Sequence, residues 1–197
     1  DTYLYQDEEI TEESIIFPRT DYAVQKYAGE MIVRNTAKEW LVMRPLFAYG
    51  GHGDMNSLIS KTLYAIANDI DNIDMFLDPD KIKDYMHVED FCYAVMQVIN
   101  SNVRNEHFNI SAQNPHSTME IVKMIDQITG VNTSQSSKLN WHPKTDYLGN
   151  HRLSNKKFID TFAYSVSRFL KAGIKDAWDD IKNSASEEFN PLKHLNE

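Results

Sequence analysis

The hydrophobic residues of the chain follow two alternating spacings, which predict helices and strands in turn. From Thr20 to between Asn35 and Lys38, apolar residues recur at helical spacing, which predicts an amphipathic helix docked on a core and capped by Thr20 or Asp21. The unbroken apolar run 40–43 predicts a strand buried on both faces of a parallel sheet. Further helices are predicted at residues 56–68, 89–99, 118–129 and 153–181 with a break at 164–167, and short strands at 2–5, 73–77, 83–88, 107–110 and 139–141. Strands that alternate with helices in this order predict an α/β fold.

Composition narrows the class of protein. The 197 residues include 42% hydrophobic side chains, enough for a packed core, and a formal net charge of -9 with scattered lysines and arginines argues against a nucleic-acid surface. No apolar run is long enough to cross a membrane and the first residues do not resemble a signal peptide, so we expect a cytoplasmic protein. Cys92 lies in an apolar run and is expected to be a buried, reduced thiol. The seven histidines lack the spacing of metal ligands, so no metal site is expected.

Tyr22 and Lys26 are the first candidates for chemistry. They stand four residues apart, so they are neighbours on one face of the predicted helix. A nearby ammonium favours the phenolate and lowers the pKa of a tyrosine from roughly 10, which suits proton exchange near neutral pH. Tyr22 is therefore a candidate general acid and base. The alternative is a chance pair at the edge of a buried helix face, and the context of the two residues decides between them.

A glycine-rich loop follows the predicted strand at 40–43. Residues 48–54 hold three of the seven glycines of the chain. Open α/β sheets bind ligands beyond the carboxyl ends of their strands, so this loop is a candidate ligand-binding segment. A plain turn before the next helix is the alternative.

Five segments, in their order and spacing, resemble the extended short-chain dehydrogenases/reductases, the family of NAD-dependent sugar-nucleotide epimerases, dehydratases and 4-keto reductases. They are residues 2–5, Tyr22-x-x-x-Lys26 with Ala28-Gly-Glu30, Arg44-Pro45 with Tyr49-Gly50, residues 83–90 and residues 152–156. The resemblance implies an α/β fold that is the C-terminal part of a Rossmann-like parallel sheet plus a small mixed substrate-binding lobe. Residues 1–45 and 83–101 would form the remainder of the dinucleotide-binding domain, 46–82 and 102–183 the substrate-binding lobe, and 184–197 a tail.

The resemblance also implies a cofactor site. Tyr22 would exchange a proton with the sugar, while Lys26 would hold the ribose of NAD or NADP and lower the pKa of Tyr22. Pro45 would lie at the cofactor, because the segment 44–50 passes close to the nicotinamide. The expected catalytic serine or threonine would lie upstream of the first residue or at Thr2.

For the substrate, a nucleotide-diphosphate sugar, the resemblance implies contacts from Phe47, Lys83 and Arg152. A solvent-facing charge is the alternative for Lys83 and for Arg152. The polar residues of segment 87–90 are expected to be structural. Phe47 stands where epimerases and dehydratases carry an asparagine, whereas 4-keto-sugar reductases of the dTDP-4-dehydrorhamnose type tend to have an aromatic residue, so the subgroup stays open.

The sequence departs from the family in one large respect. Family members carry a glycine-rich loop before the catalytic tyrosine, and this sequence has none there. We therefore expect the second half of an enzyme, whose N-terminal nucleotide-binding half was removed, lies on another chain or was lost. Family members also form dimers, which makes a homodimer a further expectation. A non-catalytic binding module that keeps the fold, or an unrelated α/β domain with a chance Tyr–Lys pair, remain as alternatives.

Overall fold

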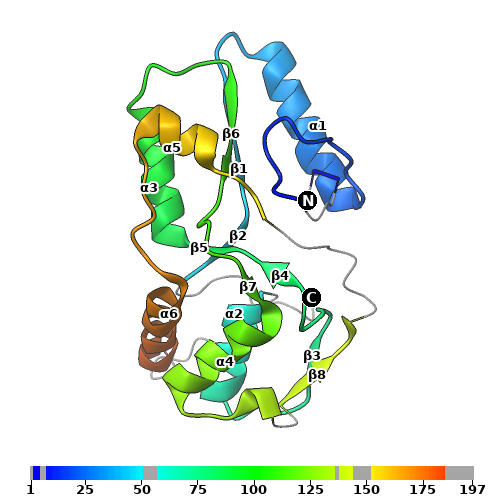
Figure 1. Cartoon of the computed structure of the whole chain (residues 1–197), viewed down its shortest axis with the longest axis vertical. Coiled ribbons are helices and arrows are strands. Elements are labelled where there is room, and N and C mark those ends of the chain that lie inside the picture. Colours follow the sequence, from blue (N-terminus) through cyan, green and yellow to red (C-terminus); the bar gives the residue numbers. More distant parts are fainter. Residues whose placement is uncertain (1, 5–7, 51–56, 136–137, 144–151, 185–197) are drawn as a thin grey trace.

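A computed structural model describes residues 2–4, 8–50, 57–135, 138–143 and 152–184 of the chain (Figure 1). Most of the glycine-rich loop and nearly all of the predicted tail lie outside the described residues. The helices are α1 (Asp21–Thr36), α2 (Leu58–Ala67), α3 (Val88–Ile99), α4 (Thr118–Thr129), α5 (Lys156–Phe162) and α6 (Leu170–Ser184), with a 3-10 helix, η1, at Thr133–Gln135. The strands are β1 (Leu41–Pro45), β2 (Phe47–Tyr49), β3 (Ile73–Met75), β4 (Ile82–Lys83), β5 (Tyr85–His87), β6 (Glu106–Ile110), β7 (His116–Ser117) and β8 (Leu139–Trp141).

Parallel strand pairs define the sheet structure. β1 pairs with β6 so that Met43 lies opposite Phe108, and β2 pairs with β5 and β3 with β8, all in parallel. Among the named strands, β4 and β7 form the antiparallel pair. Parallel neighbours need a crossover connection, and each parallel pair here is separated in sequence by at least one helix. The chain is therefore an α/β fold with parallel strands.

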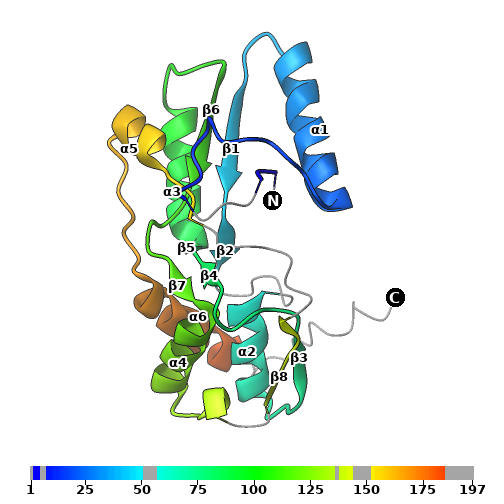
Figure 2. The same cartoon turned by 45° about the vertical axis from the view of Figure 1, so that its right-hand side comes forward.

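Helices cover both faces of the β1–β6 pair. Figures 1 and 2 show α1 on one side of these strands and α3 with α5 on the other. The α3 and α5 side holds an aromatic core, in which the rings of Phe108 and Phe158 lie 5.6 Å apart and are fully buried. The α1 side differs from the prediction of a docked helix: only Ala23 and Glu30 of α1 are buried, and Ile32 is 62% exposed.

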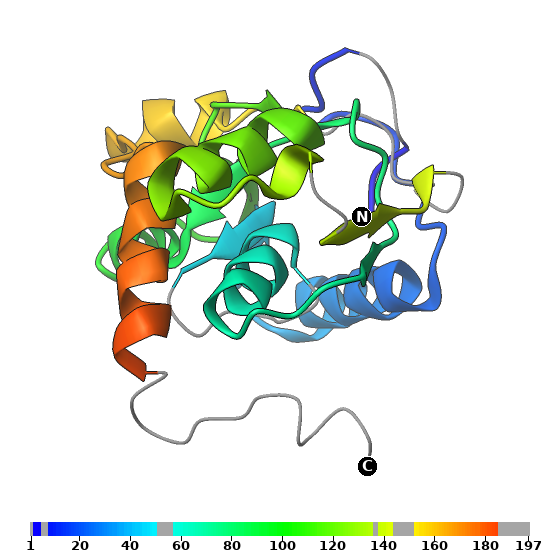
Figure 3. The same ribbon diagram turned by 90° about the horizontal axis from the view of Figure 1, so that it is seen from below.

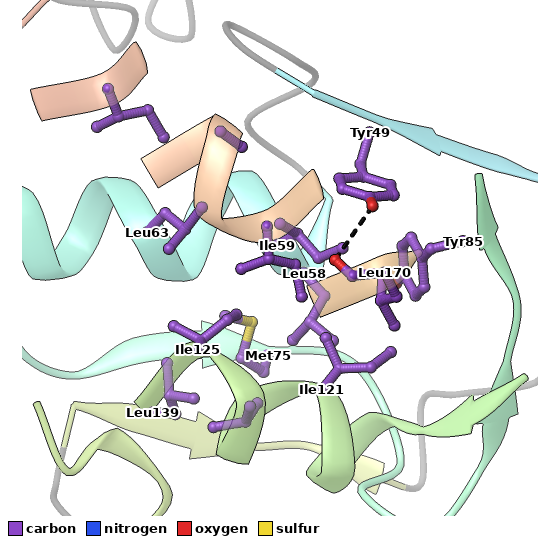
Figure 4. Close-up of a cluster of buried hydrophobic side chains, with 14 residues drawn as sticks. Tyr49, Leu58, Ile59, Leu63, Met75, Tyr85, Ile121, Ile125, Leu139 and Leu170 are labelled. Atoms are coloured by element: carbon purple, nitrogen blue, oxygen red, sulfur yellow. Dashed lines mark hydrogen bonds between the residues drawn. The ribbon is translucent and has the colours of Figure 1, made fainter. Parts of the chain in front are cut away.

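A second hydrophobic cluster lies between α2, α4 and α6, beside the β3–β8 pair (Figure 3). Ile59 and Leu63 of α2 and Ile121 and Ile125 of α4 are fully buried, each pair four residues apart, as the helical spacing predicts. At the edge of this cluster the buried Tyr49 hydroxyl donates to the carbonyl oxygen of residue 170 at 3.3 Å (Figure 4). The start of α6 is thereby fixed to strand β2.

Local sequence signals set the ends of the helices. The Thr20 hydroxyl accepts the N–H of Ala23 at 3.1 Å, which confirms the predicted start of α1. Ser117 and Glu120 form the predicted capping box at the start of α4, with bonds of 3.1 and 2.8 Å. Gly130 ends α4 in the left-handed conformation, with φ of +74°.

Other predictions from the sequence pattern hold in part or are wrong. Of the predicted strand at 2–5, the described residues form a bridge between Tyr3 and Ile16, flanked by two backbone hydrogen bonds of 2.7 and 2.8 Å, but not a longer strand. The predicted strand at 83–88 is broken at Asp84, whose buried carboxylate turns aside to accept two hydrogen bonds from a neighbouring loop. Cys92 is exposed rather than buried, because α3 turns Ala94 toward the core instead.

Candidate functional site

A pocket of about 500 Å³ lies between α1, β1 and the first described residues of the chain. Its lining residues are Thr2, Tyr22, Ala23, Lys26, Gly29, Glu30, Val33, Leu41, Val42, Met43, Arg44, Pro45 and Phe91. Tyr22, Lys26 and Pro45, which the family resemblance assigns to one cofactor site, thus line the same pocket.

Helix geometry presents Tyr22 and Lys26 to this pocket. Residues four apart on a helix stand one above the other, and Lys26 Nζ lies 5.3 Å from the centroid of the Tyr22 ring. An ammonium over the face of an aromatic ring forms a cation–π contact, which orients both side chains. Tyr22 is 60% exposed, so a ligand in the pocket can reach it.

The pocket runs along the free edge of β1. Successive residues of a strand point to opposite faces, yet Leu41, Val42 and Met43 all line the pocket. Among the described strands β1 pairs with β6 alone, which leaves its other edge uncovered. The predicted strand at 40–43 therefore begins one residue later and is half buried, not buried on both faces.

Glu30, one turn after Lys26, binds two arginines at the side of the pocket. Its carboxylate accepts from Arg44 Nε at 3.0 Å and Nη2 at 2.6 Å, and from Arg34 Nη1 at 3.2 Å. Burial by itself raises the pKa of Glu30, but the hydrogen bonds from the arginines outweigh it and hold the pKa below its usual value. Burial likewise lowers the pKa of Arg44, and the bonds to Glu30 and Tyr3 raise it on balance. The pair is therefore ionised at neutral pH.

Arg44 also holds the first segment of the chain. Its Nη1 donates to the Tyr3 hydroxyl, which in turn donates to Asn109 Oδ1 at 2.7 Å. Burial raises the pKa of Tyr3, so this hydroxyl stays protonated. The residue next to Thr2 is thus tied to β1 and β6. Sequence reasoning missed this network, because no spacing rule connects residues 3, 30 and 44.

Phe47 of β2 and Lys83 of β4 come together although their strands belong to different pairs. Lys83 is 1% exposed, and its Nζ lies 5.9 Å from the centroid of the Phe47 ring, which also packs on Tyr85 at 5.3 Å. A solvent-facing charge, the alternative considered for Lys83, is excluded by this burial. A buried ammonium is a strong local source of positive charge.

Asp84 follows Lys83 and is also buried. Its carboxylate accepts the N–H of Gln113 at 2.9 Å and that of Asn114 at 3.4 Å. Burial raises the pKa of Asp84 to about 6, and the two N–H groups lower it only in part. Asp84 therefore fastens the break between β4 and β5 to the loop after β6, at the cost of a buried charge.

Arg152 and the segment 87–90 lie apart from the pocket that Tyr22 and Lys26 line. The Arg152 side chain is exposed, and its main-chain oxygen accepts the N–H of Ile10 at 2.7 Å. His87 Nδ1 accepts the N–H two residues further on at 3.3 Å, and the Asp90 carboxylate accepts the N–H groups of residues 167 and 168, both at 3.1 Å. These contacts hold the start of α3 and the segment before α6.

A second hollow, of about 600 Å³, is lined by Gly50, His87, Val88, Glu89, Arg168, Asp176, Asp179 and Asp180. Arg168 donates to Glu89 Oε2 at 2.5 Å and to Asp176, so its charge is balanced within the hollow. Burial lowers the pKa of His87, which keeps the ring neutral. Gly50 belongs to the glycine-rich loop that the sequence marks as a candidate ligand-binding segment, and His87, Val88 and Glu89 belong to segment 83–90. Among the described residues that line the hollow, the one guanidinium is paired.

Within the described ranges, no group of three or more His, Cys, Asp or Glu side chains is placed to hold a metal ion. None of the helices in the described part of the chain is long and apolar enough to cross a membrane.

Comparison with known proteins assigns the chain to a family. A family model described as "NAD dependent epimerase/dehydratase family" matches residues 2–111, which include most of the residues discussed above. The chain belongs to the NAD-dependent epimerase/dehydratase family.

Solved structures agree with this assignment at the level of the fold. RMD from Pseudomonas aeruginosa, complexed with NADPH, is 20% identical with a TM-score of 0.79, over 93% of this chain and 64% of that one. dTDP-glucose 4,6-dehydratase from Bacillus anthracis, in complex with NAD, is 20% identical with a TM-score of 0.78, over 94% and 60%. UDP-glucose 4-epimerase from Thermotoga maritima, with UDP-glucose, is 19% identical with a TM-score of 0.81, over 92% and 60%. This member of the epimerase/dehydratase family thus spans 60–64% of the length of these relatives.

The pocket of this epimerase/dehydratase family member fits one end of a nicotinamide dinucleotide. Lys26 offers donors for ribose hydroxyls. Apart from the adjacent residues and the backbone of α1 itself, no described atom lies within 4 Å of the position that a Cβ on Gly29 would take, which leaves room beside it. In dinucleotide-binding folds a glycine-rich turn at a helix start seats the pyrophosphate, and this sequence has no glycine before Gly29. The residues present therefore fit the nicotinamide–ribose end and supply no such seat for the pyrophosphate.

Proposed function

We propose that this chain is the C-terminal part of an NAD(P)-dependent sugar-nucleotide epimerase or dehydratase, comprising the rest of a Rossmann-like sheet and a small substrate-binding lobe. The observation that carries the proposal is that Tyr22, Lys26 and Pro45 line one pocket in a member of this family. The pocket is lined by an exposed tyrosine and a lysine on one side and by a strand edge on the other. A flat nicotinamide ring and its ribose would fit between them.

In the proposed reaction Tyr22 transfers a proton to or from the sugar oxygen, and a hydride passes between the sugar carbon and the cofactor. Bound nicotinamide takes up or supplies the hydride in this chemistry. When a sugar hydroxyl is oxidised, the hydride leaves the carbon and the hydroxyl proton passes to the Tyr22 oxygen; reduction of the ketone reverses both transfers. Lys26 holds the ribose hydroxyls and balances the negative charge of the Tyr22 oxygen before it takes the proton.

Phe47, Lys83 and Arg152 are the proposed contacts of the nucleotide-diphosphate sugar. The contact between Lys83 and Phe47 supports a shared role, because it brings two of the three proposed substrate contacts together. Arg152 is the proposed second phosphate contact. A 4-keto-sugar reductase of the dTDP-4-dehydrorhamnose type is the second candidate function, favoured by the aromatic Phe47.

A separate nucleotide-binding half is the proposed partner. The pairing of β1 supports this: among the described strands β6 is its one neighbour, so the other edge offers N–H and C=O groups to which a further strand could bind. Exposed apolar side chains support it as well: on α3, Val88, Cys92 and Met96 form one stripe at four-residue spacing. The exposed Ile32 of α1 supports a homodimer through that helix.

Calorimetric titration tests the proposal. The folded chain is titrated with NADH, NADPH and a panel of UDP- and dTDP-sugars, alone and mixed with any N-terminal half encoded beside it. We expect cofactor binding in the mixture, abolished by Lys26→Ala and retained by Lys123→Ala, which removes an exposed lysine of α4. Absence of binding in both settings would instead support a non-catalytic module that retains the fold.

A further inference from the structure

Three segments that line the pocket meet at one ion pair. Glu30 lies one turn after Lys26 on α1, and Arg44 directly precedes Pro45 on β1. Two nearly parallel hydrogen bonds, of 3.0 and 2.6 Å, join the guanidinium to the carboxylate. The segment 2–4 is held by the same guanidinium, through the Tyr3 hydroxyl.

We infer that Glu30 and Arg44 are positioning residues, which set the placement of Lys26 relative to Pro45 across the pocket. The inference rests on the proposed function, in which Lys26 and Pro45 both contact the cofactor. Glu30 acts through Lys26, and Arg44 acts through Pro45 and the segment that carries Thr2.

Apolar packing contributes little to the position of α1 relative to β1, so the ion pair is the main constraint. Ala23 and Glu30 are its only buried residues, so apolar contacts constrain the helix weakly on the β1 face. A two-bond fork between a guanidinium and a carboxylate fixes orientation as well as distance, whereas a single bond fixes distance alone. The side chains of Arg44 and Glu30 are 10% and 6% exposed, so removing either partner leaves the other charge buried without its main counterion.

Arg34 provides a matched control within the same cluster. It reaches the same carboxylate by one bond of 3.2 Å, its side chain is 32% exposed, and it does not line the pocket. The Arg34 guanidinium also lies 4.9 Å from the centroid of the Trp40 ring, just before β1. Arg34→Lys keeps a cation at this position and leaves both Glu30–Arg44 bonds in place, so it changes the surroundings of Glu30 without breaking the two-bond link.

Hydrogen exchange of the full chain tests the inference without any cofactor. Wild type is compared with Glu30→Gln, Arg44→Lys and Arg34→Lys, and amide exchange is followed at residues 21–28, 41–46 and, as a reference, in α4. We expect exchange at 21–28 and 41–46 to rise by at least about tenfold in Glu30→Gln and Arg44→Lys, with α4 and the Arg34→Lys protein unchanged. Equal changes in α4, or no change at the pocket, would overturn the inference. Arg44→Lys keeps the charge and one bond, so it decides the question if Glu30→Gln does not fold.

Cofactor affinity gives a readout that general stabilisation does not move. With NADH as the probe, in the setting in which wild type binds it, Glu30→Gln is expected to weaken binding on the order of tenfold, and Arg34→Lys is expected to bind as wild type does. An equal loss of affinity in Arg34→Lys would count against positioning by the Glu30–Arg44 pair. If wild type binds no nicotinamide cofactor in any setting, the proposed function fails, and the exchange measurement still decides whether the ion pair holds α1 on β1.

Discussion

The Lys26 ammonium nitrogen lies over the Tyr22 ring, 5.3 Å from its centroid. Both residues belong to one helical turn, so their proximity depends on the helix and not on distant packing. The opposite wall of the pocket, at Pro45, belongs to a strand that α1 contacts through the Glu30–Arg44 pair. The geometry of one helical turn thus brings Tyr22 and Lys26 together, and the Glu30–Arg44 ion pair links their helix to the rest of the pocket.

The cap of α1 should control the order of the turn that carries Tyr22. Because the Thr20 hydroxyl accepts the N–H of Ala23, Thr20→Ala is expected to cost about 1 kcal/mol and to speed amide exchange at residues 21–24. Thr36→Ala, at the other end of the helix, should leave these amides unchanged. Exchange by NMR measures both; equal protection in wild type and Thr20→Ala would contradict the role of the cap.

Lys83 should contribute to binding the phosphates of the sugar nucleotide. Lys83→Met keeps the size of the side chain and removes its charge, so we expect affinity for a nucleotide-diphosphate sugar to fall by about tenfold or more, with cofactor affinity unchanged. Lys156→Met, at an exposed lysine of α5, is the control. Calorimetry on folded proteins measures both ligands, and an unchanged sugar-nucleotide affinity would remove Lys83 from the proposed site.

Asp84 should make stability depend on pH in the acid range. Burial raises its pKa to about 6, so between its unfolded pKa and that value the folded state binds more protons than the unfolded state. This residue's contribution to the free energy of unfolding should therefore fall by about 2 kcal/mol as the pH rises from 4 to 6. Urea unfolding of wild type and Asp84→Asn isolates the effect as the difference between the two proteins. A difference that stays constant with pH would show that folding does not raise the pKa of Asp84.

Two helical glycines should respond to alanine in opposite directions. A Cβ at Gly173 would overlap the Tyr49 hydroxyl and lie 3.0 Å from a ring carbon of His87, whereas a Cβ at Gly29 meets nothing within 4 Å. We expect Gly173→Ala to cost about 1–3 kcal/mol and Gly29→Ala to stabilise by about 0.5–1 kcal/mol. In a Tyr49→Phe background the cost at Gly173 should shrink. Urea denaturation measures all four proteins, and a neutral Gly173→Ala would mean that α6 moves away from β2 at little cost.

The parts of the fold that sequence predicts best are those set by residues within one helical turn. Thr20, the Ser117–Glu120 box and Gly130 each act on a neighbour four residues away or less, and the structure has the predicted ends there. The burial of Cys92 was predicted wrongly because it depends on tertiary packing and not on residues within one helical turn. In an apolar run the pattern does not fix which side of the helix faces the core, and only the packing of Ala94 decides it.

The candidate site likewise has features that the sequence predicts and features that depend on tertiary contacts. The grouping of Tyr22, Lys26 and Pro45 follows from motif order, and the structure brings the three to one pocket; their roles remain predictions. The burial of Lys83 and the Glu30–Arg44 pair had no signal in sequence, because each depends on strands and helices that meet only in the folded chain.

Proton transfer by Tyr22 is the central claim, and turnover by the Tyr22→Phe protein tests it most directly. The chain, assembled with its nucleotide-binding half, is given a nucleotide-diphosphate sugar, and conversion of the sugar nucleotide to product is followed by chromatography together with cofactor affinity. We predict that Tyr22→Phe retains cofactor binding and loses turnover by about 100-fold or more, because the phenyl ring keeps the contact with Lys26 but has no hydroxyl to carry the proton. Turnover equal to wild type in the Tyr22→Phe protein would contradict the account.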